Sequence, residues 1–74
     1  MQTVQFELDR EYIELCNLLK AVGVANSGGQ GKLMVSNGDV QVDGLPESRK
    51  TAKIRAGQTV TCLGVTIVVS APSA

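Results

Sequence analysis

The stretch from Ser27 to Lys32 has the residue types and spacing of a helix start that binds an anion. Ser27, with Gln30 three positions later, is the serine/glutamine form of a capping box and predicts that a helix begins here. Glycines at positions 28, 29 and 31 then occupy the first turn, where each costs about 1 kcal/mol relative to alanine. They would leave backbone N–H groups uncovered beside Lys32, which predicts a phosphate site. The alternative is that the glycines let another segment pack closely, and the sequence favours neither interpretation.

A second group of candidate residues is basic and follows later in the chain: Arg49, Lys50, Lys53 and Arg55. Charged loops are usually only solvated surface. This group would join a phosphate site if a short sheet placed it beside the helix that starts at Ser27, because N–H donors and cations would then share one surface. The two aromatic residues, Phe6 and Tyr12, are expected to be structural, so no base-stacking platform of the kind that reads single strands is predicted.

Other chemistries lack the residues they need. A nucleotide-binding P-loop would require glycine in place of Asn26 and a hydroxyl in place of Leu33, and a dinucleotide fingerprint would require glycine in place of Met34. The chain has no histidine to activate a serine or cysteine nucleophile. Its two cysteines are half of a tetrahedral zinc set. The sequence therefore predicts no enzyme, no cofactor, no metal site and no small-molecule substrate.

The composition indicates a single small domain over residues 1–74 with an uneven charge distribution. Residues 1–14 carry four carboxylates and one arginine, whereas residues 15–74 carry six cations and three carboxylates. Such a chain can bind a polyanion locally although its formal charge is zero. Cys16 and Cys62 lie in apolar patterns and are expected to be buried free thiols. No secretory signal follows Met1 and no apolar run reaches about 18 residues, so a cytoplasmic protein without a membrane partner is expected.

The first helix predicted to support the candidate residues runs from Arg10 to about Val22, with Asp9 as its N-cap. Apolar residues at positions 12, 15, 16, 19 and 22 recur at helical spacing and form one buried face. Glutamates at positions 11 and 14 in the early turns and Lys20 in the last turn complement the helix dipole. Gly23 is the predicted stop, and no chemistry is assigned to this helix.

The second predicted helix runs from Gly28 to Asn37 and ends at Gly38, with Leu33 and Met34 facing inward. Alternating residues predict a short edge strand at 3–8 and further strands at 40–42, 53–55, 60–62 and 65–70, with turns at 43–44 and 63–64 and a frayed end at 72–74. The predicted fold is therefore α+β, with a two-helix unit packed on a small, mainly antiparallel sheet.

This arrangement resembles the S-four-type RNA-binding domain, also called the αL motif. The likeness covers about residues 15–63: a helix, Gly-Val-Ala-Asn-Ser at 23–27, a short helix containing Lys32, Asn-Gly-Asp-Val-Gln-Val-Asp-Gly at 37–44, and Ala-Gly-Gln-Thr-Val at 56–60. The spacing from Ser27 through Gly38 to Gly44 is its most specific part. Glu-Ser-Arg-Lys at 47–50 and the strand after residue 64 resemble a stand-alone, YbcJ-like bacterial subfamily.

The resemblance implies non-enzymatic binding of structured RNA, ribosomal or transfer RNA, through the start of the second helix and the adjacent basic loop. By position it points to these RNA-binding residues: Ser27, Gly28, Gly29, Gln30, Lys32, Arg49, Lys50 and Lys53. The chain departs from the family where arginines follow the cap serine, since glycines 28 and 29 stand there, glycine 31 replaces an alanine, and Asp43 replaces the usual asparagine.

A protein-interaction module is the alternative function. It would dock on a ribosome-associated or RNA-processing assembly through an acidic helix face at Glu7, Glu11 and Glu14. Binding that is insensitive to salt and indifferent to Lys50 and Lys53 would favour this alternative over RNA binding.

Overall fold

The computed structural model describes residues 2–72, which form a five-stranded sheet with two helices on one of its faces. The sheet has the strand order β1-β7-β6-β3-β4, in which β1 and β7 run parallel and the other neighbours antiparallel. Its strands are β1 (Gln2–Glu7), β3 (Val40–Val42), β4 (Leu45–Pro46), β6 (Thr59–Cys62) and β7 (Val65–Ser70). The predicted α+β fold is confirmed, with β1 at the sheet edge as expected.

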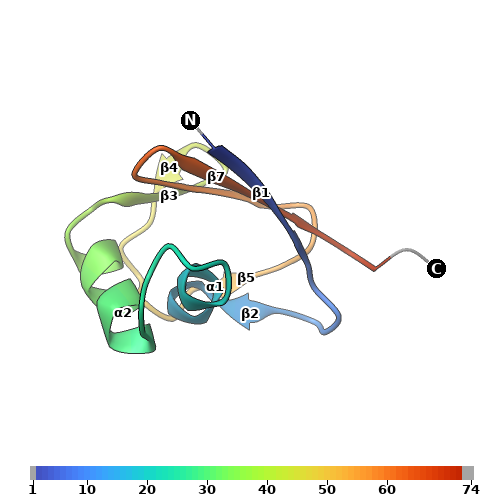
Figure 1. Ribbon diagram of the computed structural model, residues 1–74, viewed down its shortest axis with the longest axis horizontal. Coiled ribbons are helices and arrows are strands. Elements are labelled where there is room, and N and C mark those ends of the chain that lie inside the picture. The colour runs from blue at the N-terminus through green and yellow to red at the C-terminus, as the bar shows by residue number, and fades with distance from the viewer. Residues whose placement is uncertain (1, 73–74) are drawn as a thin grey trace.

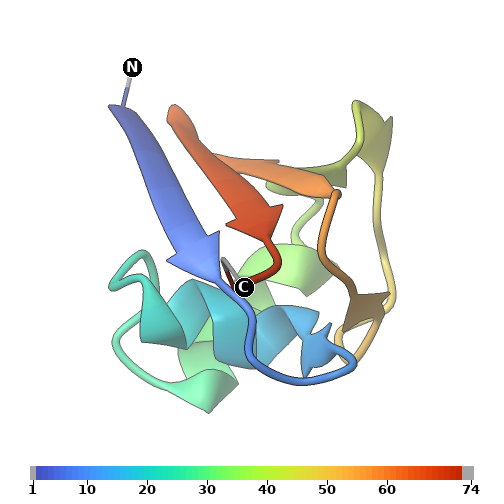
Figure 2. The ribbon, with the colours of Figure 1, turned by 90° about the vertical axis from the view of Figure 1, so that its right-hand side faces the viewer.

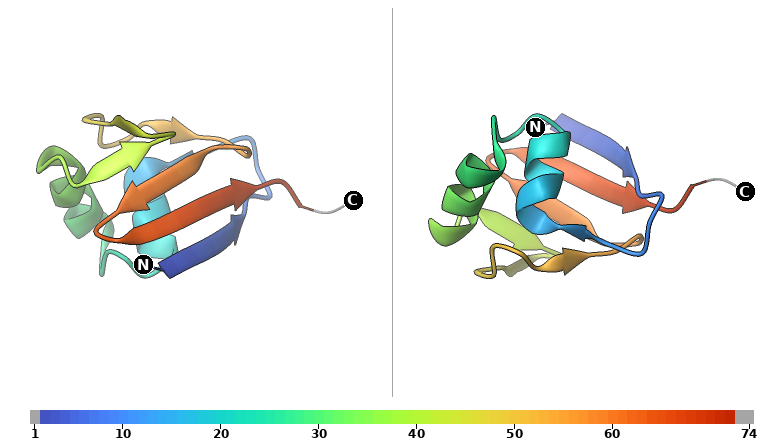
Figure 3. Two further views of the ribbon diagram at one scale, coloured as in Figure 1. Left: turned by 90° about the horizontal axis from the view of Figure 1, so that it is seen from above. Right: turned by 90° about the horizontal axis from the view of Figure 1, so that it is seen from below.

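The helices are α1 (Leu15–Ala21) and α2 (Gly28–Ser36), and a separate two-stranded sheet pairs β2 (Ile13–Glu14) with β5 (Lys53–Ile54). Figures 1 and 2 show both helices below the larger sheet, with β2 and β5 beside the start of α1. Seen from below, α1 crosses the middle of the sheet and α2 lies beside it, whereas the opposite face of the sheet carries no helix (Figure 3).

The core lies between α1 and the sheet. Side chains at alternate positions of the strands point toward the helices, which explains the period-two pattern of the sequence. The fully buried side chains include Leu15, Leu18, Leu19, Val40, Ile54, Val60, Ile67 and Val69. Cys16 and Cys62 are buried free thiols, as predicted. No helix within residues 2–72 has the length and apolar character of a membrane span.

The prediction that the first helix runs from Arg10 was wrong, because α1 begins at Leu15. Residues 9–12 form an irregular turn, and Ile13 pairs with Ile54 across the small sheet. The β-branched Ile13 gains a buried cross-strand partner there, which outweighs its helical spacing. Asp9 is therefore no helix cap, the glutamates at positions 11 and 14 both precede the first turn of the helix, and Tyr12 is absent from its apolar face. Lys20 in the last turn and Gly23 after it, with φ of 83°, stand where predicted.

The second helix was predicted to face inward through Leu33, which instead is 59% exposed. The buried stripe of α2 is Gly31, Met34 and Val35, spaced by three and four residues. The inward pair is therefore Met34 and Val35, one position later in the sequence than the predicted pair of Leu33 and Met34. Apolar residues alone did not show this, because the third member of the buried stripe is Gly31. The end of α2 agrees with prediction, since Asn37 is its C-cap and Gly38 has a φ of 80°.

The remaining strands and turns agree with the sequence, apart from the two-residue β4, which was not predicted. Asp43 and Gly44 both have positive φ, 51° and 82°, as the tight turn between β3 and β4 requires. Of the predicted frayed end at 72–74, residues 73 and 74 lie outside the described part of the chain.

Candidate functional site

The start of α2 is closed by the two side chains predicted from the capping box. Ser27 Oγ accepts a hydrogen bond from the N–H of Gln30 at 3.1 Å. Gln30 Oε1 accepts in turn from the N–H of Asn26, one residue before the cap, rather than from the cap itself. Both side chains therefore hold the backbone of the turn, and their exposure leaves them at the surface of the helix start.

The three glycines of this turn lie in different surroundings. A Cβ atom on Gly31 would lie 2.7 Å from the carbonyl oxygen of Cys16, so this glycine lets α2 pack closely on α1. A Cβ atom on Gly28 or Gly29 would meet nothing nearer than 3.8 Å. The packing interpretation is correct for Gly31, and the other two glycines have room for a side chain.

The basic loop between β4 and β5 is anchored on the start of α1. Glu14, the N-cap residue of α1, makes no side-chain capping bond. Instead, the N–H of Leu15 donates to the carbonyl oxygen of Ala52 at 2.9 Å. The N–H of Cys16 donates to the carbonyl oxygen of Lys50 at 3.2 Å. The loop thus satisfies N–H groups that every helix leaves free in its first turn.

Lys32 and the basic segment 48–53 line one open hollow of about 860 Å³. Its lining, here called the cationic hollow, consists of Lys32, Ser48, Arg49, Lys50, Thr51 and Lys53. None of these six residues is acidic. The structure therefore brings together four of the predicted site residues: Lys32 from α2, Arg49 and Lys50 from the basic loop, and Lys53 from β5. The other four, Ser27, Gly28, Gly29 and Gln30, lie at the N-terminal end of α2 outside this lining.

Arg49 is held by a residue that the sequence did not single out. Its Nε and Nη2 atoms lie 3.2 Å from the two carboxylate oxygens of Glu47, and its backbone N–H donates to Glu47 Oε2 at 3.0 Å. The hydrogen bonds from the Arg49 side chain and backbone hold the pKa of Glu47 below its usual range. The Arg49 side chain stays 78% exposed. Part of its charge is therefore offset by Glu47 while its remaining N–H groups face solvent.

Comparison with known proteins identifies the family. The S4 domain matches residues 6–70 of the chain. An Escherichia coli (strain K12) protein named "Putative RNA-binding protein YbcJ" is 48% identical over 60 residues, which is 81% of this chain and 86% of that protein. A Shigella flexneri YbcJ protein matches to the same extent. The chain belongs to the S4 domain family.

A solved structure supports the same assignment. The solution structure of Escherichia coli YbcJ superposes with a TM-score of 0.64 at 43% identity, covering 95% of this chain and 87% of that one. That structure is described as revealing an αL motif involved in RNA binding. The family and the αL-type fold expected from the sequence are thus confirmed for this S4 domain.

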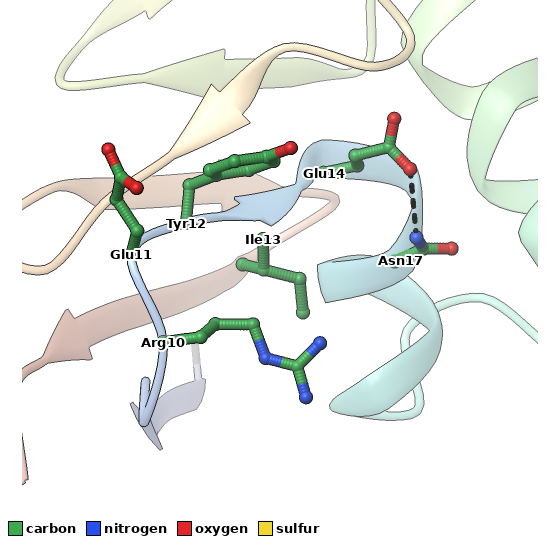
Figure 4. Close-up of a pocket in the computed structure, with 6 residues that line it drawn as sticks. All are labelled: Arg10, Glu11, Tyr12, Ile13, Glu14 and Asn17. Carbon is green, nitrogen blue, oxygen red and sulfur yellow. Dashed lines mark hydrogen bonds between the residues drawn. The ribbon is translucent and has the colours of Figure 1, made fainter.

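Tyr12 is a second surface residue of the S4 domain that sequence reasoning missed. Lys53 Nζ lies over the Tyr12 ring at 5.0 Å from its centroid, and the Arg55 guanidinium lies at 6.0 Å. Arg55 Nη1 also lies 3.2 Å from Glu11 Oε1. Tyr12 borders a hollow of about 400 Å³ next to the start of α1 (Figure 4). Arg55 therefore belongs to the surroundings of Tyr12 and not to the cationic hollow.

The three glutamates predicted to form an acidic helix face for a protein partner do not lie on a helix. Glu7 ends β1, Glu11 lies in the turn before β2, and Glu14 belongs to β2, where it accepts a hydrogen bond from Asn17 Nδ2 at 3.2 Å. Within residues 2–72 no three His, Cys, Asp or Glu side chains are grouped to hold a metal ion. The charge of the cationic hollow suits an anionic ligand, since its lining holds four cations and no carboxylate.

Proposed function

We propose that this S4 domain binds structured RNA, ribosomal or transfer RNA, without catalysing a reaction and in the cytoplasm. The observation that carries the proposal is the cationic hollow, which Lys32 of α2 lines together with Arg49, Lys50 and Lys53. Four cations around one open hollow suit the phosphates of a folded backbone, which lie close together where strands pair. The name of the Escherichia coli relative and the description of its structure support RNA as the partner.

The individual roles follow from the contacts. Lys32, Lys50 and Lys53 would bind phosphates as mobile point charges, and Arg49 would present the N–H groups that Glu47 leaves free. Ser27 and Gln30 would hold the start of α2 in shape, so that the N–H groups of Gly28 and Gly29 face a phosphate. Recognition would then depend on backbone shape more than on base sequence.

Fluorescence anisotropy with a folded ribosomal RNA hairpin tests the proposal across a salt series. If about four phosphates are neutralised, affinity falls about a hundredfold between 50 and 200 mM salt. A Lys32→Gln, Lys50→Gln double variant should bind more weakly, and its salt slope should be lower by about 2.

Lys20→Gln is the matched control, because it removes the same charge from the last turn of α1, away from the basic loop at the other end of that helix. The Lys20→Gln variant should bind the RNA hairpin nearly as tightly as wild type, whereas Lys50→Gln should bind it more weakly. Equal losses in these two single variants would mean that only net charge matters and would contradict a defined phosphate site. Salt-insensitive binding, or none, would contradict the proposed function and direct the search to a protein partner.

A further inference from the structure

Tyr12 lies on the outer face of the small β2–β5 sheet, together with two cations. Ile13 pairs with Ile54 and Glu14 with Lys53, and Ile54 is buried in the core. Because side chains alternate along a strand, Tyr12 falls on the side opposite Ile13, with Lys53 and Arg55 above its ring. This aromatic ring is therefore not a core residue and remains partly exposed.

Lys53 connects the ring to the cationic hollow. The same side chain lines that hollow and stands over Tyr12 at 5.0 Å. A nucleic-acid backbone that contacts Lys50 and Lys53 would thus carry its next nucleotide toward the ring. Arg55, beyond Lys53 along the chain, would meet the following phosphate, since its ion pair with Glu11 is exposed and easily exchanged.

The hollow beside Tyr12 has a different character from the cationic hollow. It measures about 400 Å³ and is lined by Arg10, Glu11, Tyr12, Ile13, Glu14 and Asn17. Its two carboxylates outnumber its one cation, Arg10, so the lining is net negative, unlike that of the cationic hollow. The carboxylates can accept hydrogen bonds from the amino and imino groups of a base. Ile13 and the ring supply apolar surface (Figure 4). This lining suits an uncharged, flat group better than it suits the backbone.

We propose that Tyr12 is a stacking position for one unpaired base of the RNA bound at the cationic hollow, an inference that rests on the proposed function. Base stacking on an aromatic side chain tolerates any base, because every base has a π-face. The inference revises the expectation that both aromatics are structural. It assigns to this S4 domain a preference for RNA with an unpaired nucleotide next to a paired stem.

The chain contains one tyrosine, so a ring-labelled tyrosine gives NMR signals from Tyr12 alone. Three RNAs of the same stem are compared: one with a single unpaired adenine, one with an abasic residue at that place, and one fully paired. The Tyr12 ring signals should move upfield with the first RNA, whereas the other two, which contact only Lys53 beside the ring, should cause no upfield shift of stacking. Wild-type protein should bind the first RNA about 5- to 100-fold more tightly than the second.

Two substitutions of Tyr12 test whether its ring stacks on a base or only contacts Lys53 and Arg55 within the protein. Tyr12→Leu should lose the preference for the unpaired adenine and bind the fully paired RNA as wild type does, whereas Tyr12→Phe should keep the preference. Circular dichroism checks the fold of both. Equal binding of all three RNAs by wild type, with no upfield shift specific to the unpaired adenine, would overturn the stacking position while leaving the proposed function intact. Absence of binding to every RNA would remove the proposed function, and this inference with it.

Discussion

Gly31 and Cys16 hold the two helices together through their backbones. A Cβ atom on Gly31 would lie 2.7 Å from the Cys16 carbonyl oxygen and 3.2 Å from its Cα atom. The N–H of the same Cys16 donates to the carbonyl oxygen of Lys50. One residue of α1 therefore contacts α2 on one side and the basic loop on another, which fixes Lys32 relative to the loop across the cationic hollow.

The first prediction concerns the close contact of Gly31. In Gly31→Ala the added methyl group would meet backbone atoms that can move only if the helices separate, so the free energy of unfolding should fall by about 1–3 kcal/mol. Urea denaturation followed by circular dichroism measures this change. Gly29→Ala is the control, because its methyl group finds only Ser27 Oγ at 3.8 Å and alanine favours the helix. Equal effects of the two substitutions would contradict the packing role of Gly31.

The second prediction concerns Asp43 in the turn between β3 and β4. Its φ is 51°, its Oδ1 accepts from the N–H of Thr59 at 2.9 Å, and its own N–H donates to the carbonyl oxygen of Thr59 at 2.7 Å. Asparagine tolerates this backbone region and keeps an acceptor oxygen, so Asp43→Asn should change stability by less than about 0.5 kcal/mol. Asp43→Ala should lose about 1–2 kcal/mol, because alanine has no acceptor and disfavours positive φ. A denaturant titration in which both variants are equally stable would contradict this role.

Most of the fold was predictable because local signals and tertiary packing agree. Three local patterns formed the structures that they predicted: the strand at 65–70, the turn at 43–44 and the helix cap at Ser27. The first helix failed at its start because Ile13 satisfies two patterns, helical spacing and β-pairing, and only its partner Ile54, 41 positions later in sequence number, decides between them. Such long-range pairing leaves no local mark.

The sequence predicted the cations of the candidate site but not the two residues that contact them, Glu47 and Tyr12. The residues of the cationic hollow include Lys32, Arg49, Lys50 and Lys53, all of which the sequence had singled out, although the binding role of each stays a proposal. Glu47 was missed because a carboxylate two residues before an arginine is common on solvated loops. Tyr12 was missed because its helical spacing assigned it to the core. A tyrosine in a segment with both helical and strand character is the signal that could have found it.

The third prediction uses the lowered pKa of Glu47. A carboxylate whose pKa is lower in the folded than in the unfolded protein stabilises the fold above its unfolded value of about 4.3, and this stabilisation disappears as pH falls through the folded value. Wild type should therefore be more stable than Glu47→Gln near pH 7 by an amount that stays constant down to about pH 5 and shrinks below about pH 4. Urea denaturation at several pH values measures the difference. A difference that persists unchanged at pH 3 would contradict this origin.

The fourth prediction concerns competition between Glu47 and RNA for Arg49. Glu47→Gln removes a negative charge beside the cationic hollow and keeps an oxygen that can accept from the Arg49 backbone N–H. Affinity for a ribosomal RNA hairpin at 50 mM salt should therefore rise about two- to fivefold.

A double-mutant cycle identifies the source of that gain. If the released guanidinium binds a phosphate, Arg49→Ala should weaken binding more in the Glu47→Gln background than in wild type, and the difference should diminish as salt rises. Glu7→Gln removes the same charge at the end of β1 and serves as the matched control, with affinity close to wild type. If Glu7→Gln and Glu47→Gln strengthen binding equally, the effect comes from net charge and Arg49 is not the competing group. If Arg49→Ala costs the same in both backgrounds, Arg49 contacts RNA without being restrained by Glu47, and the ion pair serves only to shape the loop.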